Sequence, residues 1–221
     1  MFEGLFGSPM KSTMVSAKSA LAGRPEQPFV LPARHSVLDA PLDVPEDADG
    51  VATIYLGLGC FWGAEKEFWN MPGVVTTAVG YQGGYTPHPT YEEVCTGLTG
   101  HTEVVKVTYD PSKLSDAQIL RAFWESHDPT QGFRQGNDVG TQYRSAVYYT
   151  TDSQAQAAAQ TLETFQSALA AKGFGAITTE IKASGVPGAG EFYFAEPYHQ
   201  QYLFKNPNGY CPVHSTGVAC E

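Results

Sequence analysis

Cys60 has the surroundings of a reactive thiol. It stands in the run Gly59-Cys60-Phe61-Trp62-Gly63, between a predicted buried strand and the start of a predicted helix. The free N–H groups and the dipole of a helix N-terminus favour an anion, so we expect the thiol to be unusually acidic. The small residues on both sides would let a substrate approach the sulfur. An inert cysteine buried at a strand end is the competing interpretation.

Glu103 is the candidate for a general acid. It begins an alternating segment in which Val105 and Val107 share its face. Partial burial on that apolar face should raise the pKa of the carboxyl group and keep it protonated near neutral pH. An ordinary exposed glutamate at a strand end is the alternative.

Two tyrosines and an aspartate lie in turn-rich segments from which polar groups can reach a pocket. Tyr91 follows Pro89, whereas Asp138 and Tyr143 belong to or follow a glycine-rich run at 131–142. Core tyrosines with satisfied hydroxyl groups are the alternative, and an Asx turn explains Asp138 nearly as well.

The hydrophobic pattern predicts the elements that position these residues. We expect strands at 51–58, 74–81, 103–109, 144–150 and 177–183, and helices at 61–70, from Ser115 to about 127, and at 153–172. Ser115 and Gln118 form a capping-box signature. From 51 to 150 the order is β-α-β-β-α-β, the split βαβ arrangement. The sequence therefore predicts an α+β fold, a two-layer α/β sandwich with a ferredoxin-like core.

These motifs together resemble the A-type peptide methionine sulfoxide reductases. The resemblance extends over roughly residues 51–211. It is carried by Gly59–Gly63, Gly80-Tyr81, Gly83-Gly84-Tyr85, Pro89-Thr90-Tyr91, Thr99–Glu103, Gln135–Ser145, Tyr198–Tyr202 and Lys205-Asn206-Pro207.

The resemblance implies thiolate attack on the sulfur of a sulfoxide. Cys60 would be the nucleophile, and Glu103 the acid that protonates the sulfoxide oxygen. Tyr91 and Tyr143 would donate hydrogen bonds to that oxygen, with Asp138 as a supporting polar group. An acid is needed close to the substrate because the sulfoxide oxygen is a poor leaving group until it is protonated.

The resemblance also implies the substrate and its pocket. Phe61 and Trp62 would enclose the methyl group of the substrate, although plain core packing is the simpler interpretation of both. The substrate would be the S epimer of methionine sulfoxide, free or in proteins, and we expect no metal ion and no cofactor.

The tail carries two cysteines suited to recycling the enzyme. Attack would leave Cys60 as a sulfenic acid, which must be reduced. Cys211 follows the turn-forming run 206–209, and an irregular tail can bring its thiol to Cys60, while Cys220 could then take over the disulfide. The resemblance implies such a relay, with thioredoxin or a glutaredoxin-like protein as reductant. Cys95 has no evident task and is expected to be a small buried hydrophobic residue.

Composition sets the wider limits. Residues 1–50 contain six scattered prolines and predict an N-terminal arm, followed by a catalytic domain at 51–204 and a loop-rich tail at 205–221. A net charge of −10 argues against a nucleic-acid partner, and the absence of an 18-residue apolar stretch argues against a membrane span. Without a recognisable signal peptide we expect a cytoplasmic monomer.

Three other functions compete. A metal site is disfavoured because the chain has no Cys-x-x-Cys and no His-x-x-x-His. A general dithiol oxidoreductase would need a second cysteine close to Cys60 in sequence. A redox sensor would need the thiol alone, and it would react with peroxide without turning over a sulfoxide.

Overall fold

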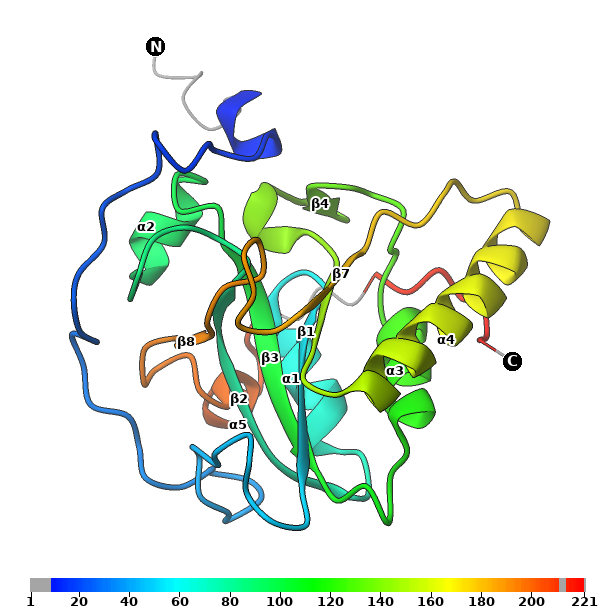
Figure 1. Cartoon of the computed structure of the whole chain (residues 1–221), viewed down its shortest axis with the longest axis horizontal. Coiled ribbons are helices and arrows are strands. Elements are labelled where there is room, and N and C mark those ends of the chain that lie inside the picture. Colours follow the sequence, from blue (N-terminus) through cyan, green and yellow to red (C-terminus); the bar gives the residue numbers. More distant parts are fainter. Residues whose placement is uncertain (1–8, 211–213, 221) are drawn as a thin grey trace.

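The computed structural model describes residues 9–210 and 214–220, and its centre is a six-stranded sheet (Figure 1). The strand order is β7-β6-β1-β3-β2-β8, and neighbours are antiparallel except for the parallel pair β6–β7. The strands are β1 (Ala52–Gly57), β2 (Val74–Gln82), β3 (Thr102–Tyr109), β6 (Ala146–Tyr149), β7 (Glu180–Ala183) and β8 (Tyr193–Phe194).

Strand β1 is central to this sheet. It pairs with β3 on one side and β6 on the other, so Ile54 lies opposite both Val107 and Tyr149. Helix α1 (Phe61–Trp69) connects β1 to β2, and β3 lies between these two strands. The order β6-β1-β3-β2 is the ferredoxin-like arrangement expected from the sequence, so the α+β prediction is confirmed.

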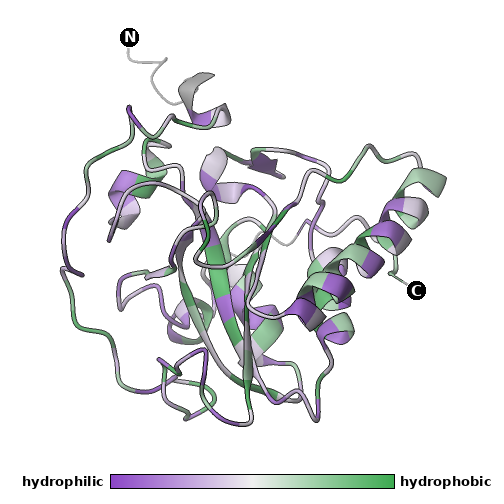
Figure 2. Ribbon diagram, in the orientation of Figure 1, coloured by the Kyte–Doolittle hydropathy of each residue, from purple (hydrophilic) through white to green (hydrophobic). Residues whose placement is uncertain are grey.

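The long helices begin at residues that satisfy their free N–H groups. Ser115 and Gln118 form the expected capping box of α3 (Asp116–Glu125), and Thr151 begins α4 (Asp152–Ala171) in the same way. Beyond α4, Gly173 has a φ of 82°, a conformation that glycine adopts without steric cost. Figure 2 shows hydrophilic and hydrophobic residues alternating along α4, as expected for a helix with one buried face.

The three longer helices pack against one face of the sheet and form the main core. The core combines strand residues with large side chains from these helices. Its members include Ile54, Leu56, Phe61, Phe68, Val105, Val107, Ile119, Phe123, Trp124, Phe165 and Leu169.

The N-terminal arm and the segment that leads to β8 cover the opposite face. Lys106 of β3 donates to Asp43 Oδ1 at 3.0 Å and to the carbonyl oxygen of Val44 at 2.8 Å. Phe192 packs against Tyr55, with ring centroids 5.1 Å apart. The arm runs along the outside of the domain as mostly irregular chain, with a short 3-10 helix at Pro9–Ser12 (Figure 1).

Several short elements differ from the sequence-based expectation. The loop segment before β3 contains a helix, the glycine-rich run contains a small hairpin and a 3-10 helix, and a helix precedes the tail. They are α2 (Tyr91–Cys95), β4 (Arg134–Gln135), β5 (Asp138–Val139), Thr141–Tyr143 and α5 (Tyr202–Lys205). Each is too short to show a hydrophobic period.

Candidate active site

Cys60 occupies the N-cap position of α1, three residues after the end of β1. Its backbone is not helical, and the next residue is the first of the helix. Gly59 has a φ of 96°, and a β-carbon there would lie 2.7 Å from Gln135 Cγ, so the approach to Cys60 requires glycine. The backbone N–H groups of Trp62 and Gly63 both act to lower the pKa of the thiol.

The expectation of an acidic thiol is nevertheless wrong for the free protein. Burial raises the pKa of Cys60 well above its usual value, and the charge of Glu103 raises it further. The helix N–H groups act in the opposite direction but are outweighed. Because Glu103 repels the thiolate only when it is ionised, protonation of this carboxyl group favours the reactive form of the sulfur.

Glu103 is the second residue of β3, and its side chain points into the same site. It is 2% exposed, and Oε2 accepts a hydrogen bond from the backbone N–H of Phe61 at 3.0 Å. Burial raises the pKa of Glu103 to about 8, the Phe61 N–H lowers it and the charge of Asp138 raises it. The expected rise is confirmed, and the carboxyl group holds its proton at neutral pH.

Tyr91 and Tyr143 join this carboxyl group from separate elements. Tyr91 is the first residue of α2, and Tyr143 is the last residue of the 3-10 helix. Burial raises the pKa of both phenols well above the usual value, and the charge of Glu103 is the next cause in each case. Tyr91 also raises the pKa of Tyr143. The structure therefore brings both phenols and the carboxyl group of Glu103 close together, with the phenols protonated.

Phe61 and Trp62 provide an aromatic wall beside the sulfur. Phe61 is 1% exposed and packs 5.9 Å from Tyr81, so it belongs to the core as well as to the site. Trp62 is half-buried, and its indole N–H donates to His199 Nδ1 at 2.9 Å. Its ring stacks on Tyr202 at a centroid distance of 3.9 Å. The sequence places Tyr202 at the end of the Tyr198–Tyr202 motif but predicts no role for it in the site.

Asp138 lies where the tail approaches the site. Tyr210 donates a hydrogen bond to Asp138 Oδ1 at 3.2 Å. Burial raises the pKa of Asp138, while Tyr210 and His214 act to lower it. The pKa of Tyr210 is raised by burial, by Asp138 and, more weakly, by Cys60. Residues on both sides of positions 211–213 therefore lie near Asp138, and Cys211 itself is outside the described residues.

Cys220 is held on other elements, α3 and α4. It is 3% exposed, its Sγ lies 3.8 Å from the carbonyl oxygen of Thr161, and its N–H donates to Glu125 Oε1 at 2.7 Å. Ser215 donates to the backbone carbonyl oxygen of the same glutamate at 2.6 Å. The described end of the tail is thus fixed at two points, and a recycling role for Cys220 requires this segment to leave its place.

We expect Cys220 to react slowly with iodoacetamide in the reduced protein, and Glu125→Ala to accelerate that reaction. The substitution removes the acceptor of the Cys220 N–H and so weakens the docked position by about 1 kcal/mol, or roughly fivefold in the exposed population. Mass spectrometry of the alkylated C-terminal peptide measures the rate. Glu163→Ala, on the exposed side of α4, is the matched control. Equal rates in all three proteins would contradict the docked arrangement.

Cys95 differs from the buried hydrophobic residue that the sequence suggested. It is half-buried at the end of α2 and shares a hydrogen bond with the Tyr91 side chain. Burial raises the pKa of its thiol, and Glu103 adds to that effect. Cys60, Cys95 and Cys220 are free thiols in the part of the chain that the structure describes.

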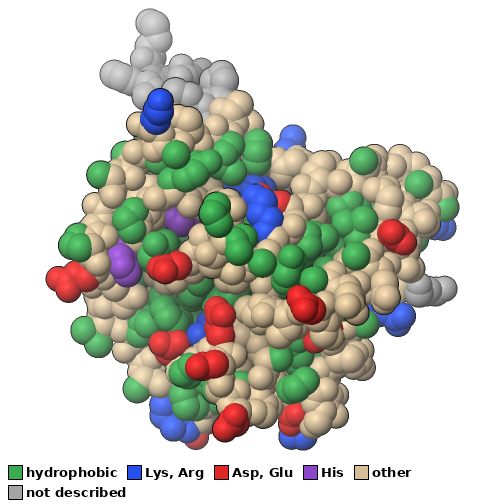
Figure 3. Space-filling model, in the orientation of Figure 1, with side chains coloured by type: hydrophobic (Ala, Val, Ile, Leu, Met, Phe, Trp, Pro, Cys, Tyr) green, Lys and Arg blue, Asp and Glu red, His purple; other side chains and the backbone are tan. Residues whose placement is uncertain are grey.

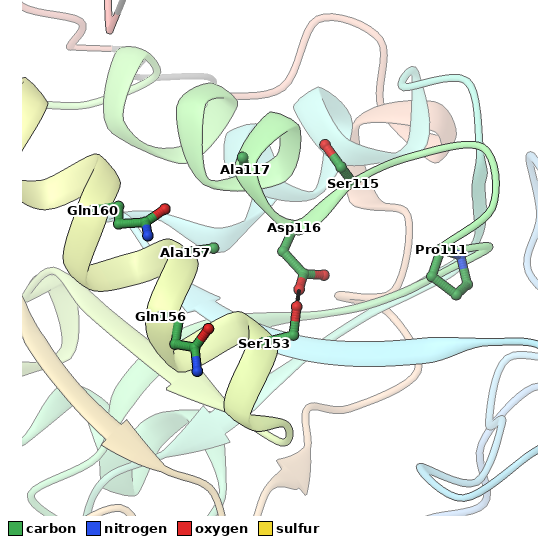
Figure 4. A pocket seen from close by; sticks show the side chains of 8 residues that line it. All are labelled: Pro111, Ser115, Asp116, Ala117, Ser153, Gln156, Ala157 and Gln160. Atoms are coloured by element: carbon green, nitrogen blue, oxygen red, sulfur yellow. Dashed lines mark hydrogen bonds between the residues drawn. The ribbon is translucent and has the colours of Figure 1, made fainter.

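One hollow on the described surface shares no residue with the candidate site. This hollow, between the first turns of α3 and α4, is lined by small and polar side chains, with Ser153 donating to Asp116 at 2.6 Å (Figure 4). On the face in Figure 3 the charged side chains are scattered. Across residues 9–210 and 214–220, no three His, Cys, Asp or Glu are grouped as metal ligands. No described helix is long and apolar enough to cross a membrane.

Comparison with known proteins decides the family. A family model for peptide methionine sulfoxide reductase matches residues 52–219. The chain belongs to the peptide methionine sulfoxide reductase family. The resemblance inferred from the motifs is thereby confirmed, and the protein is a methionine sulfoxide reductase.

Curated relatives of this reductase match nearly its whole length. Peptide methionine sulfoxide reductase MsrA of Corynebacterium kroppenstedtii is 57% identical over 218 residues, which is 98% of this chain and 99% of the relative. MsrA 1 of Synechocystis is 55% identical over 219 residues, covering 99% and 95%. The reductase is therefore similar to these proteins in its arm and tail as well as in its central domain.

Solved structures agree with the fold of the reductase. Methionine sulfoxide reductase A of Corynebacterium diphtheriae has a TM-score of 0.84 at 53% identity, covering 94% of this chain and 98% of that one. Mxr1 from Saccharomyces cerevisiae in reduced form has a TM-score of 0.66 at 35% identity, covering 76% and 93%.

Proposed function

We propose that Cys60 attacks the sulfur of methionine S-sulfoxide while Glu103 protonates the sulfoxide oxygen. The observation that carries this proposal is the buried carboxyl group of Glu103, which accepts the backbone N–H of Phe61, the residue next to the nucleophile, and whose pKa is raised by burial to about 8. A sulfoxide oxygen becomes a good leaving group when it gains a proton, and an acid with a pKa near the working pH donates efficiently.

The protons and electrons of the step balance within the site. Glu103 gives its proton to the oxygen, and the resulting carboxylate can accept the proton that the Cys60 thiol loses. Attack forms a bond between Cys60 Sγ and the sulfoxide sulfur. The sulfur–oxygen bond then breaks as the oxygen passes to Cys60 Sγ, and the bond between the two sulfurs breaks to release methionine and leave Cys60 as a sulfenic acid. Methionine sulfur is reduced by two electrons and Cys60 is oxidised by two, so this step needs no other electron donor.

The remaining site residues bind and orient the substrate. Tyr91 and Tyr143 donate hydrogen bonds to the sulfoxide oxygen, which is consistent with phenols that stay protonated. Asp138 supports them at the edge of the site. Phe61 and Trp62 receive the methyl group of the substrate. Because the methyl group faces these rings while the oxygen faces Glu103 and the tyrosines, only the S epimer fits. The substrate is free methionine sulfoxide or a residue in an exposed protein segment.

A disulfide relay completes the cycle. Cys211 attacks the sulfenic acid of Cys60, which releases water and forms a disulfide, and Cys220 then displaces Cys60 from it. The contact of Tyr210 with Asp138 supports the first exchange, because it brings the residue before Cys211 to the site. A thioredoxin, or alternatively a glutaredoxin-like protein, returns two electrons by thiol–disulfide exchange.

We further propose an arm at 1–50, a catalytic domain at 51–204 and a recycling tail at 205–221. We place the protein in the cytoplasm, where thiols are normally kept reduced, as the proposed thiol chemistry requires. A net charge of −10 opposes self-association and supports a monomer.

Single-turnover mixing with each epimer separately tests this function. We expect the reduced protein to release methionine from the S form and to lose two thiols in the first turnover, with no methionine from the R form. If neither form yields methionine while Cys60 still reacts with peroxide, the catalytic proposal is wrong and Cys60 acts as an oxidant sensor.

A further inference from the structure

The N-terminal arm contacts helix α2, which begins at Tyr91, through the ion pair of Arg24 with Glu93. Arg24 Nη1 lies 3.0 Å from Glu93 Oε2, and Arg24 Nη2 lies 2.8 Å from Glu93 Oε1. The two side chains are 28% and 27% exposed, so the pair is partly withdrawn from water. Arg24 also donates to the carbonyl oxygen of His88. A bidentate contact between a guanidinium and a carboxylate fixes the relative orientation of the two side chains as well as their distance.

Glu93 is the residue that shapes the start of α2. Its Oε2 accepts the N–H of Thr90 at 2.9 Å, and the Thr90 hydroxyl accepts the N–H of Glu93, which makes a reciprocal capping box. Tyr91 is the first residue of the helix that this box begins. The same carboxylate thus binds Arg24 on one side and the N–H of Thr90, the residue before Tyr91, on the other, while the N–H of Tyr91 itself donates to Glu196 Oε1 at 2.8 Å.

The arm is also fixed just before this ion pair. The N–H of Leu21 donates to the carbonyl oxygen of Leu98 at 3.1 Å, and its carbonyl oxygen accepts from Thr86 at 2.9 Å. A β-carbon on Gly23 would overlap the carbonyl oxygen of Pro87, so the arm lies directly on this loop. Figure 1 shows the arm passing beside α2.

We propose that Arg24 is a positioning residue, which acts through Glu93 to hold the Tyr91 hydroxyl at the sulfoxide oxygen. The inference rests on the role proposed above for Tyr91. It gives the arm a task in catalysis although the arm lies outside residues 52–219, the range that the family model matches. Only arginine can satisfy both carboxylate oxygens in a plane, so lysine at this position should not restore the geometry.

A double-mutant cycle tests whether Arg24 acts through Tyr91. The rate of methionine release in a single turnover at saturating S-sulfoxide is measured for the wild type, Arg24→Gln, Arg24→Lys, Tyr91→Phe and the Arg24→Gln/Tyr91→Phe double variant. We expect Arg24→Gln to slow release by about five- to tenfold, the net worth of one hydrogen bond, and Arg24→Lys to recover little. In the Tyr91→Phe background Arg24→Gln should add almost nothing.

The control lies on the same arm. Arg34 pairs with Asp39 at the surface, with Arg34 59% and Asp39 87% exposed, and Arg34→Gln should leave release unchanged. Thermal unfolding of every variant excludes global destabilisation as the cause.

Each outcome has one meaning. An equal slowing by Arg24→Gln with and without Tyr91 would mean a general structural effect, which overturns the inference and leaves the proposed reaction intact. No effect of Tyr91→Phe would remove Tyr91 from the mechanism and the inference with it. Absence of methionine release from the wild type would instead overturn the proposed reaction.

Discussion

Glu103→Gln should slow methionine release by roughly 10²–10⁴-fold, the usual worth of a general acid. Glutamine keeps the size of the side chain, and its amide oxygen can still accept the N–H of Phe61, but it has no proton of comparable acidity to give. The single-turnover rate with S-methionine sulfoxide measures the effect. Glu67→Gln, an exposed change on α1, is the matched control. Unchanged release would remove Glu103 from the mechanism.

The same substitution should make Cys60 easier to alkylate at alkaline pH. Glu103 raises the pKa of Cys60 only while it is ionised, and its own pKa is about 8. Below that pH the carboxyl group is neutral and the two proteins should alkylate alike. Above it the wild-type carboxylate opposes the thiolate, whereas glutamine does not, so the variant should react faster. Identical iodoacetamide rates up to pH 10 would contradict the electrostatic coupling of these two residues.

Cys211→Ser should allow one methionine per protein and then stop turnover. The sulfenic acid would form on Cys60 without a partner thiol to resolve it, and a sulfenic-acid probe such as dimedone should label Cys60 stoichiometrically. Steady-state turnover with thioredoxin should fall by at least about 100-fold, because resolution would depend on an external thiol attacking the half-buried sulfur of Cys60.

Cys220→Ser is the matched comparison for this prediction. It should release one methionine, form the Cys60–Cys211 disulfide with loss of two thiols, and then turn over slowly with thioredoxin. Dimedone labelling should be absent. If Cys211→Ser cycles at the wild-type rate, the relay is wrong. If both variants behave alike, Cys211 and Cys220 have no separate functions.

The long elements were predictable because their signals are local. Helix α3 begins at Ser115 as the capping box indicated, and α4 differs from its predicted bounds by one residue at each end. Helix α2 was not predicted although Thr90 and Glu93 form a local capping-box signature, because a five-residue helix is too short to show a hydrophobic period. Its capping glutamate is held by Arg24, 69 residues earlier, and no short window of sequence contains both.

The error about the Cys60 thiol has the same origin. The argument from the helix N-terminus uses neighbours in sequence, and those N–H groups do act in the expected direction. Burial and the charge of Glu103 come from the folding of distant segments, and they are larger. The position of Cys220 against α3 and α4 was likewise beyond a sequence pattern. The sequence motifs identify the candidate residues. The direction of the pKa shift of Cys60, by contrast, depends on burial and on Glu103, which only the folded structure shows.

The pairing of β1 with both β3 and β6 has a consequence for synthesis of the chain on the ribosome. Ile54 cannot complete its pairing until Tyr149 has been made, nearly a hundred residues later. Such distant pairing delays folding until most of the domain is present. A nascent chain therefore carries Cys60 before Glu103 and Tyr143 exist, and during that interval oxidants meet an ordinary unfolded thiol rather than a catalyst.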